Sequence, residues 1–544
     1  MKKKLLFLVA ALALFVPSVM AAEVNDAESL KKCLIDGGTC KVTKDIDATK
    51  EERIIISKNA TLDLNGKTIE ALLKVSGKDT VFNINSSTSS GKLIGKVGSD
   101  GAAILVDSGK IILNGGTIIN EGTGVKGAYG IYCLNDATAI VNGGEIKALD
   151  AALTGNNTTG TMHFEVNGGV LTALRGPSIY MPEQVSLKIT NGVLNGGISV
   201  RMGTITIAGG TINAFNGNEK YAIDKPEDYY AFSGNPWFPD GISVLGGTYD
   251  SKSEDGNILN LTITGGTINV NNKLGSAVAI YDFGKLKQEM KVSITGGKFS
   301  TISDSRNALD ILNLEDLNVT NPKTGYGVVS NSVSALITGG TFSTDVTKFV
   351  ADKYVVNKNG NSYAVVENKV LETNDEKVIF ESAEAIRNDL VLNVTEKSED
   401  EVKKGSEKVT DAYKDNKKVK DVKLISLYEI NVLNGDGRVE ELEDGNYTIS
   451  IAIAESEQKF NTYKVVYFDE DGKLVETLDA KLENGKVVFT TTHLSTYGVI
   501  GYNTVAPENP KTSDINLTLI LSMIALGSAG AVISYKKKNS KANN

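Results

Sequence analysis

A short phrase containing two adjacent glycines recurs through the middle of the chain and constrains its fold more than any other feature. Its eight copies begin at Asn114, Asn142, Asn167, Ala208, Leu245, Thr264, Thr295 and Thr338. A short alternating run, such as residues 111–113 or 292–294, comes before most copies and predicts a β-strand. The first copies follow one another after 28 and 25 residues, a period typical of stacked repeat proteins.

Glycine suits such a repeat because it adopts positive φ at little cost, so one bend can be copied in every repeat. The apolar residue after each bend should then point inward and stack on its equivalents. These residues are Ile118, Ile146, Leu171, Ile212, Ile268, Phe299 and Phe342. The patterns of a propeller or a leucine-rich repeat are not visible, so we predict an all-β solenoid of parallel coils.

The beginning of this region adds a family resemblance. Residues 27–30 open a short helix, residues 44–46 follow, and residues 60–69 read ATLDLNGKTI. This order resembles the capping helix and first coils of right-handed parallel β-helix proteins of the pectate-lyase superfamily. The resemblance covers residues 23–366 and implies a right-handed parallel β-helix there.

The N-terminus has the layout of a secretory signal peptide. Residues 2–4 are lysines, residues 5–16 are mostly apolar, and small residues precede Ala22. An N-terminal membrane helix is the alternative, but this apolar run is too short to span a bilayer. We expect residues 1–22 to be removed on secretion.

The C-terminus reads NPKTS at residues 509–513, followed by an apolar stretch at 515–534 and lysines at 536–538. This layout resembles the cell-wall sorting signal of Gram-positive surface proteins, in which Leu-Pro-x-Thr-Gly precedes a membrane helix and a basic tail. The recognition residues would be Asn509, Pro510, Lys511, Thr512 and Ser513, with Asn and Ser in place of the usual Leu and Gly.

That resemblance implies that a sortase cuts after Thr512 and joins it to peptidoglycan. Before sorting, the apolar stretch would span the membrane once, with its lysines in the cytoplasm. A permanent membrane anchor is the alternative. In either case residues 23–508 lie outside the cell.

Charge and composition exclude several classes of function. The chain has 57 basic and 66 acidic residues, which argues against a nucleic-acid binder that relies on net positive charge. Removal of both ends leaves it more acidic, because each end is basic. With two His and three Cys, we predict no metal site and no cofactor.

Enzymes of the resembled superfamily use an acidic cluster that holds Ca²⁺, or paired carboxylates on adjacent coils. Two carboxyl groups about 5 to 9.5 Å apart are required for glycoside hydrolysis. Asp304, Arg306 and Asp310 are the best candidates, and Arg201 is a second basic residue that could join such a group. Because 304–310 has the pattern of a solvated loop, we expect no catalytic residues and no enzyme.

The histidines and cysteines have simpler expected roles. We expect His163 to be a half-buried residue on a strand and His493 to begin a strand of another domain. Cys33 and Cys40 flank a Gly-Gly turn in a secreted chain, which favours a disulfide over free thiols. Cys133 fits a small core residue.

An aromatic insert at residues 215–241 stands out from the repeat. Long loops on a rigid scaffold often carry binding residues, and aromatic faces stack on sugar rings. The candidate ligand-binding residues are Tyr229, Tyr230, Phe232, Trp237 and Phe238. The alternative is that these side chains fold back and cover a coil.

A second domain is expected at residues 367–503. Ser398 and Glu401 form a capping box that starts a helix ending near Lys414, and alternating strands with Asp-Gly and Asn-Gly turns follow. This pattern predicts a small β-sandwich stalk with the helix beside it. The acidic run at 469–472 fits a hairpin better than a Ca²⁺ loop. Residues 504–544 hold the linker, sorting signal, membrane helix and basic tail.

We therefore expect a cell-wall-anchored surface protein that acts as an adhesin or carbohydrate-binding module without catalysis. Its expected partners are a sortase, peptidoglycan, and host or environmental glycans, with no nucleic acid. A polysaccharide lyase or glycoside hydrolase of the same fold is one alternative. A structural or protein-binding wall component is the other.

Overall fold

A computed structural model describes most of the chain between residues 21 and 505. The described ranges are 21–88, 91–96, 101–123, 127–156, 161–214, 230–232, 235–237, 239–244, 259–281, 290–312, 333–442, 445–469 and 471–505. The chain divides into two compact units between Asn368 and Lys369. The expected boundary lay two residues earlier. The predicted sorting signal and all but the last two residues of the predicted signal peptide lie outside the described ranges.

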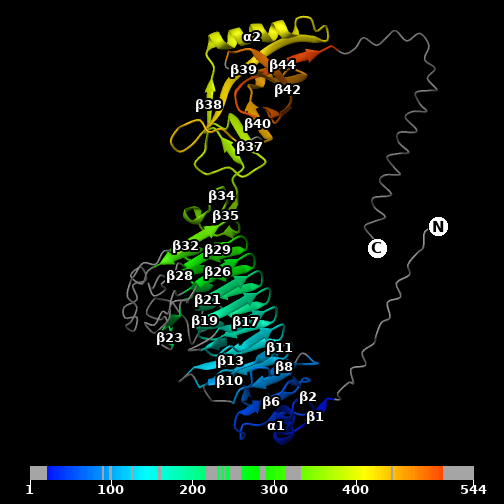
Figure 1. Ribbon diagram of the computed structural model, residues 1–544, viewed down its shortest axis with the longest axis vertical. Coiled ribbons are helices and arrows are strands. Elements are labelled where there is room, and N and C mark those ends of the chain that lie inside the picture. The colour runs from blue at the N-terminus through cyan, green and yellow to red at the C-terminus, as the bar shows by residue number, and fades with distance from the viewer. Residues whose placement is uncertain are drawn as a thin grey trace, which may run out of the picture. The chain divides into compact units, whose positions relative to one another are not determined.

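The first unit is built from two large sheets, and Figure 1 shows their strands stacked one above another. The 20-stranded sheet is parallel throughout. It contains β1 (Ala22–Val24), β2 (Gly38–Val42), β4 (Ile54–Ile56), β5 (Ala60–Asp63), β7 (Leu73–Val75), β8 (Val81–Asn85), β10 (Gly101–Val106), β11 (Lys110–Leu113), β13 (Ala128–Cys133), β14 (Thr138–Val141), β16 (Ala151–Gly155), β17 (Met162–Val166), β19 (Ile179–Ile189), β21 (Ile198–Ile207), β25 (Ile242–Val244), β26 (Leu259–Ile263), β28 (Val278–Tyr281), β29 (Met290–Ile294), β31 (Leu309–Leu312) and β32 (Val333–Ile337).

The 13-stranded sheet is parallel except at its C-terminal end. It contains β3 (Ile46–Asp47), β6 (Thr68–Glu70), β9 (Lys92–Ile94), β12 (Thr117–Asn120), β15 (Glu145–Ala148), β18 (Val170–Ala173), β20 (Val193–Gly196), β22 (Thr211–Ala214), β27 (Thr267–Val270), β30 (Lys298–Thr301), β33 (Thr341–Phe342), β34 (Tyr354–Asn359) and β35 (Ser362–Glu367).

Strand pairing follows the sequence repeat. The strand β11 pairs in parallel with β8 and β14, and β12 pairs in parallel with β9 and β15. A typical repeat therefore places two strands in the first sheet and one in the second. The inward side chains of both sheets form one apolar core that extends from Val24 to Val365.

The two glycines of each phrase are needed for different reasons. The second glycine has positive φ, as at Gly144 (76°) and Gly169 (79°). The first lies against the backbone of the preceding coil: a Cβ on Gly168 would be 2.5 Å from the carbonyl oxygen of Asn142. The turn at Asn191 and Gly192 (φ 107°) has the same place in the stack, although Asn hides it from a search for Gly-Gly.

The predicted inward column is confirmed. Ile118, Ile146, Leu171, Ile212, Ile268, Phe299 and Phe342 are all buried. The rings of Phe299 and Phe342 stack with their centroids 4.6 Å apart. The copy that begins at Leu245 lies outside the described residues. The strand β22 pairs directly with β27, so the described column consists of residues from the other seven copies together with Leu194.

The first coil is closed by α1 (Ala27–Asp36), the short helix expected from the sequence. Asp26 and Ser29 form a capping box at its start, and Leu30 and Leu34 are buried. A disulfide bond of 2.07 Å joins Cys33 to Cys40 of β2. At the other end, β34 and β35 form an antiparallel hairpin next to β33.

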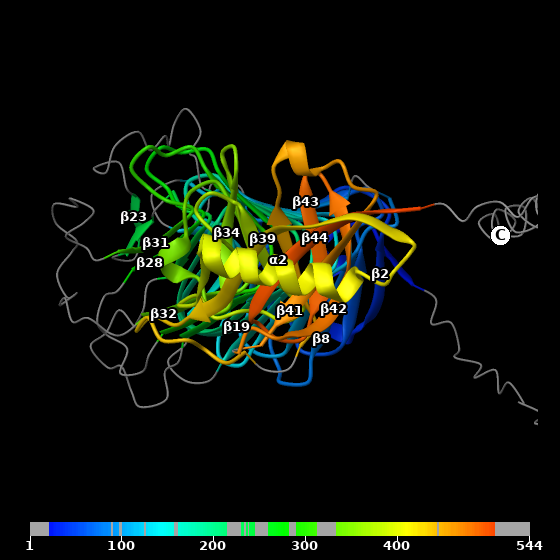
Figure 2. The same ribbon diagram turned by 90° about the horizontal axis from the view of Figure 1, so that it is seen from above.

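The second unit contains one nine-stranded antiparallel sheet and the helix α2 (Glu399–Tyr413), which lies across it (Figure 2). Its strands are β36 (Val370–Glu372), β37 (Val378–Ser382), β38 (Val391–Glu396), β39 (Val419–Leu433), β40 (Tyr447–Ala452), β41 (Thr462–Phe468), β42 (Leu474–Glu483), β43 (Lys486–Thr491) and β44 (Thr496–Thr504). The Ser398–Glu401 capping box is present as predicted.

This sheet differs from the expected two-sheet sandwich. The strand β42 pairs with both β41 and β43 and so joins all nine strands into one sheet. Alternate side chains pack on opposite faces: Val466 lies in the cluster beneath α2, and Val465 lies in the larger cluster on the other face. The sequence pattern missed β42 because most of its side chains are exposed.

Between the antiparallel strands β41 and β42, the backbone N–H of Gly472 donates to the Asp469 carbonyl at 2.8 Å, in agreement with the predicted hairpin. The Asp469 carboxylate accepts a hydrogen bond from the backbone N–H of Lys473 at 2.7 Å, and Gly472 has a positive φ of 67°. Among the described residues, neither helix is long and apolar enough to cross a membrane.

Candidate functional site

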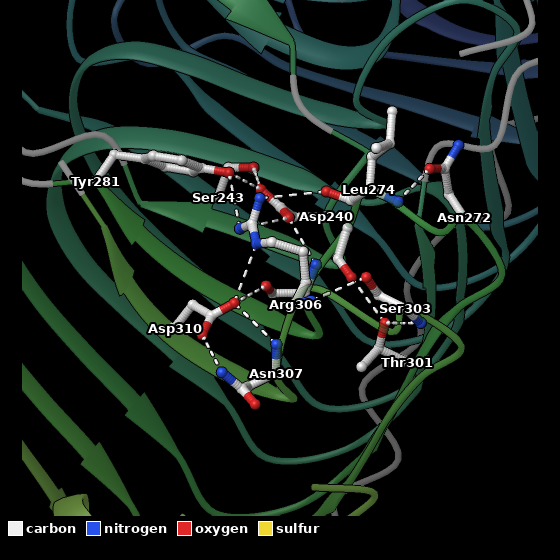
Figure 3. Close-up of polar contacts among 12 residues, drawn as sticks. Asp240, Ser243, Asn272, Leu274, Tyr281, Thr301, Ser303, Arg306, Asn307 and Asp310 are labelled. Carbon is white, nitrogen blue, oxygen red and sulfur yellow. Dashed lines mark hydrogen bonds and ion pairs between the residues drawn. The ribbon is translucent and has the colours of Figure 1, made fainter. Parts of the chain in front are cut away.

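A cluster of buried polar side chains joins three neighbouring coils of the first unit (Figure 3). Its members come from the segments that enter β25, β28 and β31, namely Asp240, Ser276 and the stretch from Arg306 to Asp310. Ser243 of β25 and Tyr281 of β28 complete it. The cluster thus lies where the chain passes from the second sheet to the first.

Arg306 is the centre of this cluster. Its Nε donates to Asp310 Oδ2 at 3.0 Å, its Nη2 lies 3.6 Å from Asp240 Oδ1, and its Nη1 donates to the Leu274 carbonyl at 3.2 Å. Ser276 bridges the two acids, since its N–H donates to Asp240 and its hydroxyl donates to Asp310. The Tyr281 hydroxyl donates to Asp240 Oδ2 at 2.5 Å. Each carboxylate is therefore hydrogen-bonded within the cluster.

Burial and charge act in opposite directions on the two acids. Asp240 is 1% exposed, and burial raises its pKa although Arg306 opposes that shift. Burial also acts to raise the pKa of Asp310, but hydrogen bonds from Asn307, Ser276 and Arg306 outweigh it and lower that pKa. Burial raises the pKa of Tyr281 well above its ordinary value.

The prediction that residues 304–310 form a solvated loop is therefore wrong for two of the three candidate catalytic residues. Arg306 is 9% exposed and Asp310 is 5% exposed and lies on β31, whereas Asp304 is exposed as predicted. The sequence pattern failed because Asp240, far away in the chain, supplies the second partner. Both oxygens of each buried carboxylate already accept hydrogen bonds, so this geometry favours a structural role for the cluster.

A second buried ion pair occupies the equivalent place in earlier coils. Arg175 Nη2 donates to Asp150 Oδ2 at 3.1 Å, and that oxygen also accepts the N–H of Ala128 at 2.7 Å. Both side chains are almost fully buried. Arg201, the other basic residue considered for catalysis, is 1% exposed on β21. The buried Asp150–Arg175 pair therefore also links neighbouring coils.

The aromatic insert contains a two-stranded hairpin. Its strands, β23 (Tyr230–Phe232) and β24 (Asn235–Trp237), are antiparallel, with Tyr230 opposite Trp237 and Phe232 opposite Asn235. Tyr229 and Phe238 lie outside the described residues. The structure thus places three of the five candidate ligand residues on one hairpin.

Sequence reasoning missed a second aromatic group on the first sheet. Tyr129 and Tyr132 of β13 are half-buried, with ring centroids 5.3 Å apart. Tyr129 packs on Tyr180 and Ala151, which form a cluster separate from the main core. The signal was present as Tyr-Gly-Ile-Tyr, where Gly130 lies against Ile146 of the core and the tyrosines lie outside it.

Two ladders of polar side chains run across the coils. In the first, each amide donates to the previous one at 2.9 to 3.1 Å, from Asn167 through Asn142 and Asn114 to Asn85. The second runs from Asn269 through Asn213 and Asn195 to Thr172. Because each amide side chain donates to the next, these ladders stabilise the stack.

The histidines and Cys133 offer no cluster for chemistry. His163 is exposed on β17 rather than half-buried, since its position alternates with the buried Met162 and Phe164. His493 lies in the turn before β44 rather than at a strand start, and its ring packs edge-on against Tyr467. Cys133 is a buried free thiol. Within the described ranges, no three His, Cys, Asp or Glu side chains are placed to hold a metal.

A pocket of about 650 Å³ lies between α2 and the sheet of the second unit. Its charged lining is largely internally paired: Lys397 lies 2.5 Å from Glu429 and 3.8 Å from Glu401, and Lys408 donates to the Gly472 carbonyl. This pairing leaves little charge for a ligand. Comparison of the whole chain with protein-family models, curated proteins and solved structures gives no match.

Proposed function

We propose that the first unit is a right-handed parallel β-helix. The in-register parallel pairing, the three-strand repeat and the glycine bends at one place in every coil support this fold. The nine-stranded second unit would then act as a stalk.

The protein is, in this proposal, a surface protein that a sortase attaches to peptidoglycan and that binds glycans without catalysis. The layout of residues 1–22 supports secretion, and that of residues 509–544 supports attachment to the cell wall. The observation that carries the binding role is the half-buried pair Tyr129 and Tyr132, held on strand β13 beside the buried Asp150–Arg175 ion pair. Exposed aromatic faces on a fixed scaffold suit sugar rings.

The test is binding of the purified full chain to a glycan array with host mucin glycans, plant uronans and bacterial wall polymers. Tyr132→Ala should weaken binding and leave the unfolding temperature unchanged, while Tyr132→Phe should keep most of the signal because it keeps the ring. The double variant Trp237→Ala, Tyr230→Ala tests whether the insert hairpin also takes part: weaker binding at an unchanged unfolding temperature would add the hairpin to the site, and a matched loss of stability would make it a structural cover of a coil.

The array also distinguishes the alternatives. Signal on uronans followed by release of unsaturated or reducing ends would support a lyase or hydrolase. Such products would overturn the non-catalytic proposal. The absence of binding to every glycan on the array would favour a structural or protein-binding component of the wall.

A further inference from the structure

The outward side of the first sheet carries a row of paired side chains in its early coils, three of them apolar or aromatic and one a lysine. Ile55 of β4 pairs with Lys74 of β7, Lys74 pairs with Leu105 of β10, and Leu105 pairs with Tyr132 of β13. We call these four residues the early strip. Adjacent strands lie about 4.8 Å apart, so the strip spans about 14 Å across the coils.

The early strip is accessible. Ile55 is 51% exposed, and Leu105 and Tyr132 are partly exposed. The side chain of Lys74 is 28% exposed and contributes its aliphatic stem. Tyr129 extends the aromatic end of the strip, because its ring lies beside that of Tyr132. A row of exposed apolar groups on a soluble, acidic surface indicates a contact site.

The charged groups of this strip are already engaged. Lys74 Nζ lies 3.1 Å from the Asp107 carboxylate. Arg53, next to Ile55, donates to the carbonyl oxygens of Leu73 and Ala102 at 2.8 Å. At the other end, Asp150 is paired with Arg175. Of the described side chains, the cations Lys74 and Arg53 at the strip are thus already paired, and the rest of the strip presents apolar and aromatic groups rather than a cation for a carboxylate-bearing sugar.

We propose that the early strip binds a linear, uncharged polysaccharide, with its sugar rings stacked along the axis of the coils and one end on Tyr132 and Tyr129. The inference rests on the proposed function and names its ligand class and site. A neutral chain suits the paired charges, and its repeat suits a row of contacts at regular steps. The short strip gives several weak contacts rather than one deep pocket.

The test is calorimetric titration of the purified full chain with neutral hexasaccharides, including cellohexaose and mannohexaose, and with hexagalacturonate as the charged probe. We expect binding of at least one neutral probe and none of the charged one. Tyr132→Ala should weaken binding about tenfold, and Ile55→Ser should weaken it less. Tyr132→Phe should bind as the wild type does, because it keeps the ring.

Ile302→Ser is the matched control, since Ile302 is 53% exposed but lies outside the strip. Its binding should equal that of the wild type. Neutral binding that survives Tyr132→Ala would overturn this site while leaving glycan binding intact. Preference for hexagalacturonate would overturn the ligand class. Failure to bind any probe here or on the glycan array would overturn the proposed function itself.

Discussion

The outward side of the first sheet changes character along the stack of coils. From β4 to β13 it carries Ile55, Leu105 and Tyr132, which are apolar or aromatic and partly exposed. From β25 to β31 it carries Ser243, Tyr281 and Asp310, which are polar or hydrogen-bonded and buried. Both sets lie on the side of the sheet away from the common core.

In our proposal, accessibility rather than residue type separates the contact surface from the structural cluster. The charged cluster has the residue types of an active site, yet its groups bind one another and hold three coils together. Three of the four residues of the early strip are apolar or aromatic, as in a core, yet they are partly exposed. Substitutions should therefore affect stability in one region and binding in the other.

The largest expected effect is that of Arg306→Ala on stability. The substitution leaves Asp240 and Asp310 buried near each other without their cation, which typically costs about 3 to 5 kcal/mol of unfolding free energy. Denaturant unfolding of the full chain measures this loss. Glycan binding at the early strip should stay unchanged in the folded variant.

A triple variant sharpens the same point. Replacing Arg306 by Met and both aspartates by Leu removes the three charges of the cluster, so that no buried charge is left without a partner, although Ser243, Ser276 and Tyr281 lose their acceptors. It should therefore be more stable than Arg306→Ala alone. If the triple variant instead abolished glycan binding without unfolding, the cluster would belong to the ligand site and the comparison would fail.

The disulfide offers a way to perturb the other end of the stack. Cys33→Ser with Cys40→Ser removes the link between α1 and β2, and loss of a disulfide typically costs about 2 to 4 kcal/mol. In the proposed solenoid each coil contacts mainly its neighbours, so the loss should concentrate in the first coils. Hydrogen exchange should rise in β2, β4 and β5 and stay unchanged in β28 and β31. A uniform rise would mean that all coils unfold together.

Local patterns predicted the all-β class and the glycine bends of the first unit well and the polar cluster poorly. The Gly-Gly phrase located the bends and the inward residues because each bend is specified by its own few residues. The start of helix α2 at Ser398 was predicted for the same reason, because its capping box involves only residues 398–401. In contrast, the second unit was expected to be a sandwich, and its single sheet depends on β42, a strand that was not predicted although residues 478–483 alternate between partly buried and exposed.

Site residues were also predicted well only where their partners are near in the sequence. The sequence around Arg306 has the pattern of a solvated loop because its partner Asp240 belongs to another coil. The early strip is even harder to predict, since Ile55, Leu105 and Tyr132 become neighbours only through strand register. Only the stacking of the coils brings such residues together.

Acid should reveal the hydrogen bonds to Asp310. Its pKa is lowered in the folded state, so its contribution is present above the unfolded value of about 3.9 and is lost as pH falls below it. The pKa of Asp240 is raised, so its effect on stability changes with pH in the opposite direction. A variant of Asp310 is therefore needed to isolate the effect of that residue. Asp310→Asn should be less stable than the wild type at pH 7, and the difference should shrink between pH 4 and pH 2. Guanidinium unfolding across this range measures it, and a constant difference would contradict the assignment.

The smallest expected effect on stability is that of Ile55→Ser in the early strip. Because the side chain is about half exposed, its loss should change the unfolding free energy by no more than about 0.5 kcal/mol. If Ile55 is instead covered by another part of the fold, the cost should approach that of a core residue, about 2 kcal/mol or more. Denaturant unfolding beside Ile302→Ser separates these outcomes, since both variants remove an isoleucine of similar exposure. Equal stability in the two variants would leave binding as the property that distinguishes Ile55, which is the result that a contact surface requires.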